Sequence, residues 1–189
     1  MRTVALCLVA ASAALLLTVH PAHADEAAVK ALAQGGHAIL MRHARISGHA
    51  KALVLDPKGN CANEENLSDE GRAQAQRMKA MLDKAGVKFE AVLASPFCRT
   101  RDTAQLAFGQ PTVEPNLTAL ELGTQEQAQA RTKAMTALLA RHAGKGSVAL
   151  VTHRPNIDAL TMEIVEEGEA IVARIQPSGE FDIVGRIKP

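Results

Sequence analysis

The sequence is poor in aromatic residues. It contains four phenylalanines and no tryptophan or tyrosine, which is 2% of its 189 residues. Proteins that bind single-stranded nucleic acid stack bases on aromatic side chains, and proteins that bind nucleic acid generally carry a basic patch. Here the 21 basic and 20 acidic residues are balanced. Both observations argue against a nucleic-acid partner.

Long apolar runs are also missing, except at the N-terminus. Arg2 precedes an apolar core over residues 4–19, and the segment that follows ends at Ala24 in the small-x-small pattern that signal peptidase cuts. No later segment approaches the roughly 20 apolar residues of a transmembrane helix. We therefore predict a signal peptide over residues 1–24, a single domain over residues 25–189, and an exported (periplasmic or secreted) protein without a membrane anchor.

Cysteine is scarce as well. Cys7 lies in the predicted leader, so the mature chain keeps only Cys61 and Cys98. In an oxidising compartment such a pair is more often bridged than free. The sequence therefore predicts a Cys61–Cys98 disulfide, which would stabilise the fold by roughly 4 kcal/mol in the chain-entropy model.

The chain does contain short apolar runs that alternate with helical patterns. The runs that indicate buried strands cover residues 38–41, 91–94 and 148–151. Two later segments, residues 169–175 and 181–187, alternate apolar and polar residues about a turn and indicate a hairpin. Strands that alternate with helices predict an α/β fold with a mostly parallel sheet.

Three helix starts carry clear signals. Ser68 precedes two acidic residues and an apolar face at helical spacing, and Thr124 with Gln127 matches a capping box. Ser95 and Pro96 follow the second apolar run as an N-cap and first-turn pair. We therefore expect helices to begin at these three points. Residues 46–65 have no clear period and are predicted to form a long loop, which in a compact domain is often functional.

Cationic and imidazole side chains follow each predicted strand. Arg42 and His43 follow the first, Arg99 comes shortly after the second, and His153 and Arg154 follow the third. Parallel strands would bring these groups to one edge of the sheet, with no obvious carboxylate between them. Guanidinium groups match phosphate oxygens bidentately, so this set predicts a pocket for a dianion.

These motifs resemble those of the histidine phosphatase (phosphoglycerate-mutase-like) superfamily, and among its members the small exported bacterial ones. The Arg-His-Gly signature appears as Arg42-His43-Ala44, with alanine in place of glycine. The other matching segments, in order, are residues 67–75 (LSDEGRAQA), residues 95–104 (SPFCRTRDTA) and Thr152-His153. The resemblance implies a three-layer α/β/α sandwich with a central, mostly parallel sheet.

The resemblance also implies roles for the pocket residues. His43 would take the phosphoryl group as a nucleophile, and Arg42, Arg99 and His153 would hold the phosphate oxygens. Arg154 and Arg45 could extend the pocket toward a small phosphorylated substrate. Alternatively, both could be solvated loop arginines. Phosphoryl transfer depends mainly on positioning and electrostatics, so this arrangement requires no metal or other cofactor.

The proton donor for the leaving group departs from the family pattern. Much of the family has a glutamate two residues after the leucine of a Leu-x-Glu-x-x-x-Gly stretch. Aligning Leu117 and Gly123 with that stretch places Ala119 at the donor position. Glu121, two residues further on, is our predicted donor. The phytase-like branch uses an aspartate directly after the second histidine, and that place holds Arg154 here.

The leading hypothesis is an exported phosphatase that acts on a phosphomonoester or a similar phosphorylated substrate. A second hypothesis is a phosphate-binding module of the same fold that has lost turnover because the acid is missing. A third is a zinc site formed by His43, His153 and a cysteine, although adjacent guanidinium groups would oppose the cation. A mutase is disfavoured, because an exported compartment offers little glycolytic substrate.

Overall fold

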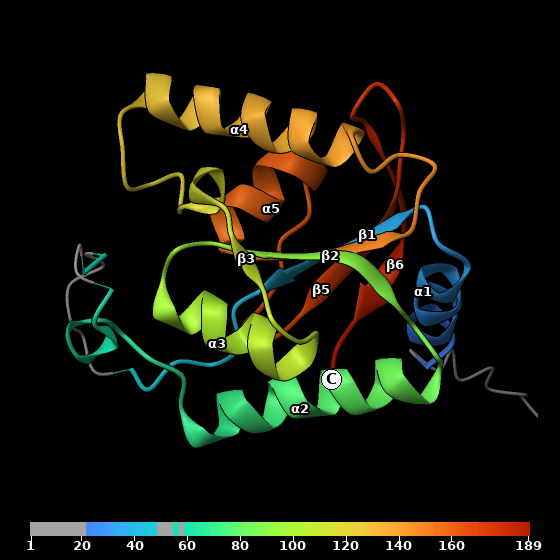
Figure 1. Cartoon of the computed structure of the whole chain (residues 1–189), viewed down its shortest axis with the longest axis horizontal. Coiled ribbons are helices and arrows are strands. Elements are labelled where there is room, and N and C mark those ends of the chain that lie inside the picture. The colour runs from blue at the N-terminus through green and yellow to red at the C-terminus, as the bar shows by residue number, and fades with distance from the viewer. Residues whose placement is uncertain (1–21, 49–54, 57–58) are drawn as a thin grey trace, which may run out of the picture.

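The computed structural model describes residues 22–48, 55–56 and 59–189, so residues 1–21 of the predicted leader lie outside the described residues. Within that part, one sheet has the strand order β3-β2-β4-β1-β5-β6 (Figure 1). The strands are β1 (His37–Arg42), β2 (Phe89–Ala94), β3 (Thr112–Val113), β4 (Ser147–Thr152), β5 (Ala170–Ile175) and β6 (Phe181–Ile187). All three predicted buried strands and the predicted hairpin, β5–β6, are present.

The sheet is parallel on one side of β1 and antiparallel on the other. β1 pairs with β4 in parallel, and β2 pairs in parallel with both β4 and β3. β5 runs antiparallel to β1, and β6 antiparallel to β5. Because Arg42 pairs with Thr152 and Ala94 with Val151, β1, β2 and β4 end at the same edge of the sheet. The residues that follow these three strands therefore meet there.

Helices cover both faces of the sheet. They are α1 (Ala22–Gln34), α2 (Asp69–Lys84), α3 (Cys98–Ala107), α4 (Gln125–Ala140) and α5 (Arg154–Thr161), with short 3-10 helices η1 (Cys61–Asn63) and η2 (Pro115–Leu117). In Figure 1, α4 and α5 lie on one side of the sheet and α1, α2 and α3 on the other. Within the described residues, no helix combines the length and the apolar character needed to cross a bilayer.

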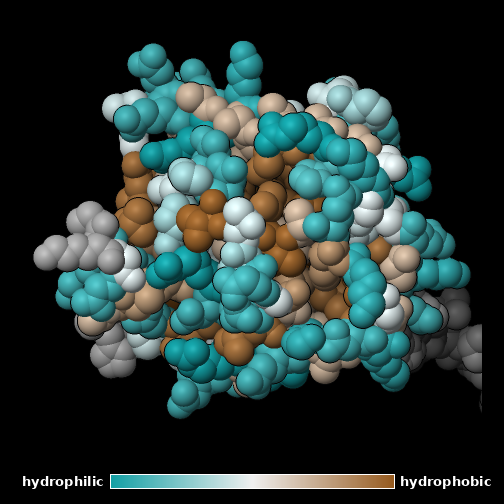
Figure 2. Space-filling model, viewed as in Figure 1, coloured by the Kyte–Doolittle hydropathy of each residue, from teal (hydrophilic) through white to brown (hydrophobic). Residues whose placement is uncertain are grey.

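Two apolar clusters lie between these layers. Ile39 and Met41 of β1 pack in the cluster formed with α1, α2 and α3, whereas Ala38 and Leu40 pack in the cluster formed with α4 and α5. This division arises because successive side chains of a strand point to opposite faces. Figure 2 shows apolar side chains gathered between α4 and α2, while the outer surface of α2 is hydrophilic. The predicted three-layer α/β/α sandwich is confirmed.

Two of the three predicted helix starts are correct. The Gly71 amide donates to the Ser68 hydroxyl at the start of α2, and Thr124 and Gln127 form a reciprocal capping box at the start of α4. The prediction that Ser95 caps the next helix is wrong, because α3 begins three residues later and has no side-chain cap. Ser95 instead continues the edge of the sheet, where its amide donates to the Val151 carbonyl at 3.0 Å.

The predicted disulfide is present, and it ties the predicted long loop to the start of α3. The two sulfurs, of Cys61 in η1 and Cys98 in α3, are 2.07 Å apart. The buried Glu64 carboxylate adds a second link, because it accepts the Cys98 amide hydrogen at 2.6 Å. Residues 49–54 and 57–58 of the same loop lie outside the described residues. The described end of the loop is therefore held against the residue that precedes Arg99.

Candidate functional site

A cavity of about 440 Å³ lies at the edge of the sheet where β1, β2 and β4 end. It is lined by side chains that follow β1 and β4, by the first turn of α3, and by the turn before α4. All six residues that the sequence predicts for the site line it: Arg42, His43, Arg99, Glu121, His153 and Arg154. Arg45 does not line the cavity.

His43 is buried, 6% exposed, and held in one orientation. Its Nδ1 lies 2.9 Å from the Ala44 carbonyl oxygen. A carbonyl oxygen only accepts, so Nδ1 carries the ring proton and Nε2 keeps its lone pair. Burial lowers the pKa of His43 to about 3, the Ala44 hydrogen bond opposes this, and Arg99 and Arg42 lower the pKa further. His43 is therefore a neutral imidazole near pH 7, which is the nucleophilic form.

His153 is held by partners on both ring nitrogens. Its Nδ1 lies 3.4 Å from Arg99 Nη2, and its Nε2 lies 2.9 Å from the Ser95 hydroxyl. A guanidinium only donates, so Nδ1 accepts and the proton on Nε2 is donated to Ser95. The Phe97 ring meets the His153 ring edge to face at 5.3 Å. Burial, followed by the charge of Arg99, holds the pKa of His153 well below its usual value.

Arg99 is a buried cation, 3% exposed, at the floor of the cavity. Its guanidinium carbon lies 4.3 Å from the centroid of the Phe97 ring. Within the described part of the chain, its side chain makes one hydrogen bond, to His153, and no ion pair with a carboxylate. Burial lowers the pKa of Arg99 and nearby carboxylates, Glu64 first, raise it, but a guanidinium stays charged. The site therefore holds a buried positive charge that a bound anion would neutralise.

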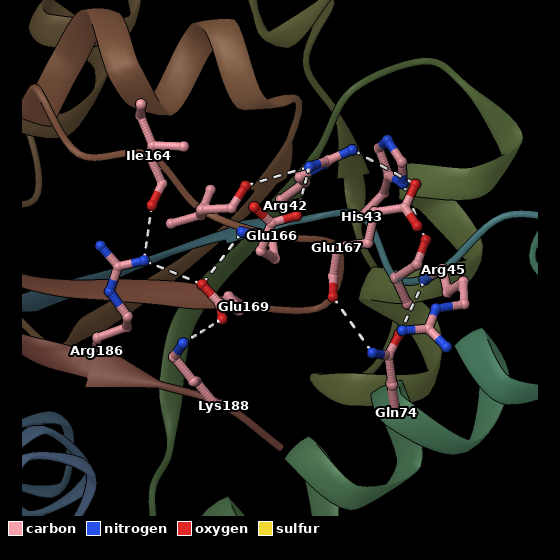
Figure 3. A network of polar contacts seen from close by, with 12 residues as sticks. Arg42, His43, Arg45, Gln74, Ile164, Glu166, Glu167, Glu169, Arg186 and Lys188 are labelled. Atoms are coloured by element: carbon pink, nitrogen blue, oxygen red, sulfur yellow. Dashed lines mark hydrogen bonds and ion pairs between the residues drawn. The ribbon is translucent and has the colours of Figure 1, made fainter. Parts of the chain in front are cut away.

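Arg42, by contrast, is held by the loop before β5 (Figure 3). Its guanidinium donates to the Val165 carbonyl at 3.2 Å and pairs with the Glu167 carboxylate at 3.5 Å. Gln74 of α2 donates to the Glu167 carbonyl at 3.3 Å and accepts the Arg45 amide hydrogen at 3.0 Å. The loop and α2 thus fix the Arg42 side chain at the carboxyl end of β1.

Ion pairs at the end of the hairpin anchor this loop. Arg186 of β6 donates to the Ile164 carbonyl at 2.7 Å and pairs with the Glu169 carboxylate (Figure 3). It also pairs with the Glu163 carboxylate. Lys188 pairs with Glu169 at 2.7 Å. Burial raises the pKa of Glu169, but hydrogen bonds from Lys188, the Glu166 amide and Arg186 lower it more. Glu169 therefore stays ionised and holds the loop to β6.

The structure also explains the motif over residues 67–75. A Cβ atom on Gly71 would lie 2.0 Å from the Arg45 carbonyl oxygen, so a side chain cannot be accommodated there without moving the backbone. The Ser68 hydroxyl donates to that same carbonyl at 3.1 Å. Thr103 of α3 accepts the Ala44 amide hydrogen at 3.0 Å. These contacts fix the backbone directly after His43.

The prediction that no carboxylate lies among the cationic groups is wrong. Glu65, Asp158 and Glu167 line the cavity together with the predicted Glu121. Glu65 and Glu167 lie in irregular segments, where no periodic pattern points to a site. Asp158 could have been found, because it lies four residues after Arg154, and residues at that spacing share a face of a helix such as α5.

Two further outcomes concern the alternatives. Ala119, at the family's donor position, is 1% exposed and does not line the cavity, whereas Glu121 does. The zinc hypothesis is contradicted, because Cys61 and Cys98 are bonded to each other and neither provides a thiolate. Sequence reasoning also missed the contacts that Ser95 and Phe97 make with His153, which depend on the extended backbone before α3.

Comparisons with known proteins agree with this geometry. Residues 38–127 match the histidine phosphatase superfamily (branch 1). Among solved structures, the chain is similar to the protein histidine phosphatase SixA complexed with tungstate, with a TM-score of 0.60 and 20% identity over 81% of this chain and 97% of that chain. It is also similar to the phosphoglycerate mutase of Thermus thermophilus, with a TM-score of 0.56 and 19% identity over 81% and 99% of the two chains.

A third similar structure is a putative alpha-ribazole-5'-P phosphatase from Escherichia coli K-12, with a TM-score of 0.57 and 19% identity over 80% of this chain and 96% of that chain. No curated protein sequence matches the chain. At these identities the structural likeness shows the fold. The match over residues 38–127 supports the resemblance to the histidine phosphatase superfamily for that part of the chain, and the fold is phosphoglycerate-mutase-like.

Proposed function

We propose that this chain, with its histidine-phosphatase-type fold, is an exported phosphatase that hydrolyses a phosphomonoester, or a similar phosphorylated substrate, through a phosphohistidine at His43. The observation that carries the proposal is the state of His43. Its neutral ring is fixed through Nδ1, so Nε2 is free to react, and Arg42, Arg99 and His153 line the same cavity. The phosphatases among the similar structures support the same class of reaction.

The reaction would proceed in two displacements. Arg42 and Arg99 bind the phosphate oxygens, and His43 Nε2 attacks phosphorus as the bond to the leaving oxygen breaks. Glu121 gives its proton to that oxygen and is left ionised. Water then attacks the phosphohistidine, its proton returns to Glu121, and release of phosphate restores the neutral His43. This scheme requires no metal.

The first test is hydrolysis of an aryl phosphate with and without EDTA. An aryl leaving group needs little protonation, so the assay does not depend on the acid. We expect EDTA to have no effect and His43→Ala to lose activity by at least about 10³-fold, because it removes the covalent route. His142→Gln, which changes a histidine outside the cavity, is the matched control. Activity retained by His43→Ala would refute the proposal.

The role of Glu121 has its own test. Glu121→Gln should slow the hydrolysis of an alkyl phosphate, whose alcohol is a poor leaving group, by about 10²–10⁴-fold, the usual contribution of a general acid. It should slow the hydrolysis of an aryl phosphate far less. Glu65→Gln and Asp158→Asn test the other carboxylates that face the cavity. A loss that depends on the leaving group in one of these variants, and not in Glu121→Gln, would assign the acid to that residue instead.

One observation favours the second candidate, a non-catalytic phosphate-binding module. The residue at the family's donor position, Ala119, is buried and cannot transfer a proton. This candidate predicts that vanadate or phosphate binds while the aryl phosphate is not turned over. The aryl phosphate assay therefore separates the two candidates.

Export is supported by the leader pattern and by the disulfide. Cleavage after Ala24 would remove the first three residues of α1, which begins at Ala22. Four residues of α1 beyond that point are buried in the core: Ala28, Val29, Ala31 and Leu32. We expect N-terminal sequencing of the exported protein to begin at Asp25. A protein that retains Met1 in the cell would contradict export.

A further inference from the structure

The charges that line the cavity do not suit a substrate that is only anionic. Among the described residues that line it, three arginines (Arg42, Arg99 and Arg154) face four carboxylates (Glu65, Glu121, Asp158 and Glu167), and both histidines are neutral. A bound phosphate dianion would leave the occupied cavity with three negative charges in excess. If Glu121 is protonated as the leaving-group donor, two remain. Uncompensated like charges within one cavity repel each other, so positive charge on the remainder of the substrate would favour its binding.

The positive and negative groups occupy different depths of the cavity. Arg99 and His43 are more than nine-tenths buried, and Arg99 pairs with no carboxylate of the described residues. This buried guanidinium and the free Nε2 of His43 point to an anionic ligand at the floor. Asp158 is exposed and Glu65 half-buried, so these two carboxylates lie nearer the solvent. The floor thus fits the phosphate, and the rim faces the rest of the substrate.

Two of the rim carboxylates form no ion pair within the described residues, although the charge of Glu65 acts on Arg99 and helps to raise its pKa. The Glu167 carboxylate forms an ion pair with Arg42, and Glu121 is assigned to proton transfer. Over residues 22–48, 55–56 and 59–189, no side chain or amide forms a hydrogen bond or ion pair with the carboxylates of Glu65 or Asp158. They approach the cavity from separate elements, the loop that the disulfide holds and the middle of α5.

We propose that Glu65 and Asp158 form a subsite for a cationic group, so that the preferred substrate is a phosphomonoester that also carries a protonated amine. An ammonium donates up to three charge-assisted hydrogen bonds to carboxylates. It would also offset the negative charge that the phosphate leaves uncompensated. The inference rests on the proposed function, because it assigns the phosphate to the floor of the cavity.

The experiment compares substrate pairs in which an ammonium replaces a hydroxyl of similar size. The short pair is phosphoethanolamine and ethylene glycol monophosphate, and the longer pair is glucosamine 6-phosphate and glucose 6-phosphate. We expect kcat/KM for the amine to exceed that for the hydroxyl by about tenfold in at least one pair, because two charge-assisted contacts are gained. The preference should fall as salt is raised, since exposed charges are screened.

Two variants test the residues. Glu65→Gln and Asp158→Asn should each lower kcat/KM for the amine and raise it for the hydroxyl, because the same change removes an attraction for one and a repulsion for the other. A merely structural effect would move both in the same direction. Glu180→Gln, on the β5–β6 turn outside the cavity, is the matched control and should leave the preference unchanged.

The outcomes separate this inference from the proposed function. Turnover of both members of each pair at equal kcat/KM would overturn the subsite and leave the phosphatase intact. If no ester is hydrolysed, the aryl phosphate included, the phosphatase proposal fails. In that case, dissociation constants measured by calorimetry for the same pairs test the subsite. Equal affinity for the amine and the hydroxyl compound would overturn it.

Discussion

Ser95 lies at the centre of the arrangement around His153. The hydroxyl accepts the proton of Nε2, which leaves Nδ1 as the nitrogen that faces Arg99. Ser95→Ala removes that acceptor, so the imidazole can adopt either tautomer. We expect kcat for an aryl phosphate to fall by about tenfold or more, as when an orienting partner of a site histidine is lost.

The readouts for this prediction are kinetics and the ¹⁵N chemical shifts of His153, which report the tautomer. Ser147→Ala is the matched control, because Ser147 is also buried and bonded, to the Leu32 carbonyl at 2.8 Å, but lies at the opposite end of β4. A fall in kcat without a change of tautomer would contradict a positioning role for Ser95.

Residues that belong to linear motifs were predictable. Arg42, His43 and His153 follow apolar runs directly, so their place at the sheet edge follows from the strand ends alone. The roles of Ser95 and Phe97 were not predictable, because they depend on where α3 begins. Ser-Pro is a strong helix start by local rules, but the sheet edge and His153 hold this serine in an extended backbone. Here tertiary contacts override local preference.

At the scale of elements, the disulfide is the main tie between the 59–66 segment and α3. It joins residues 37 positions apart in the sequence. The double variant Cys61→Ala/Cys98→Ala should lower the free energy of unfolding by about 4 kcal/mol, because the unfolded chain regains the entropy of an open loop. Urea denaturation measures the change.

Wild-type protein treated with a reductant is the control for this prediction and should show a similar loss. A double variant as stable as the oxidised protein would show that Glu64 and its bond to the Cys98 amide suffice to hold the segment. The pairing itself was predictable, because residues 25–189 contain only these two cysteines. The carboxylates that the segment brings to the cavity were not, because no periodic pattern places a loop residue.

At the scale of the whole molecule, the two buried histidines make stability depend on pH. The folded-state pKa of His43 lies at about 3, against about 6.5 in the unfolded chain. Below pH 6.5 the unfolded chain therefore takes up a proton that the folded protein does not, so stability is complete above pH 6.5 and falls as the pH is lowered toward 3. His43 alone should cost about 2 kcal/mol between pH 6.5 and pH 5.

Urea denaturation at a series of pH values tests this dependence. His43→Gln should flatten the slope below pH 6.5, whereas His142→Gln, outside the cavity, should not. His153 contributes in the same direction, since its pKa is also lowered by burial. An equal slope in wild type and His43→Gln would contradict a neutral, buried His43.

The position of β1 in the sheet has a consequence for how the chain is made. β1 is completed at residue 42, but the strands on either side of it, β4 and β5, begin only at residues 147 and 170. A growing chain therefore carries this buried strand unpaired until most of the protein has been synthesised. Pairings this distant in sequence form slowly and leave apolar surface open to aggregation. A nascent chain would thus remain threadable through a narrow channel, and dependent on holding chaperones, until synthesis is almost complete.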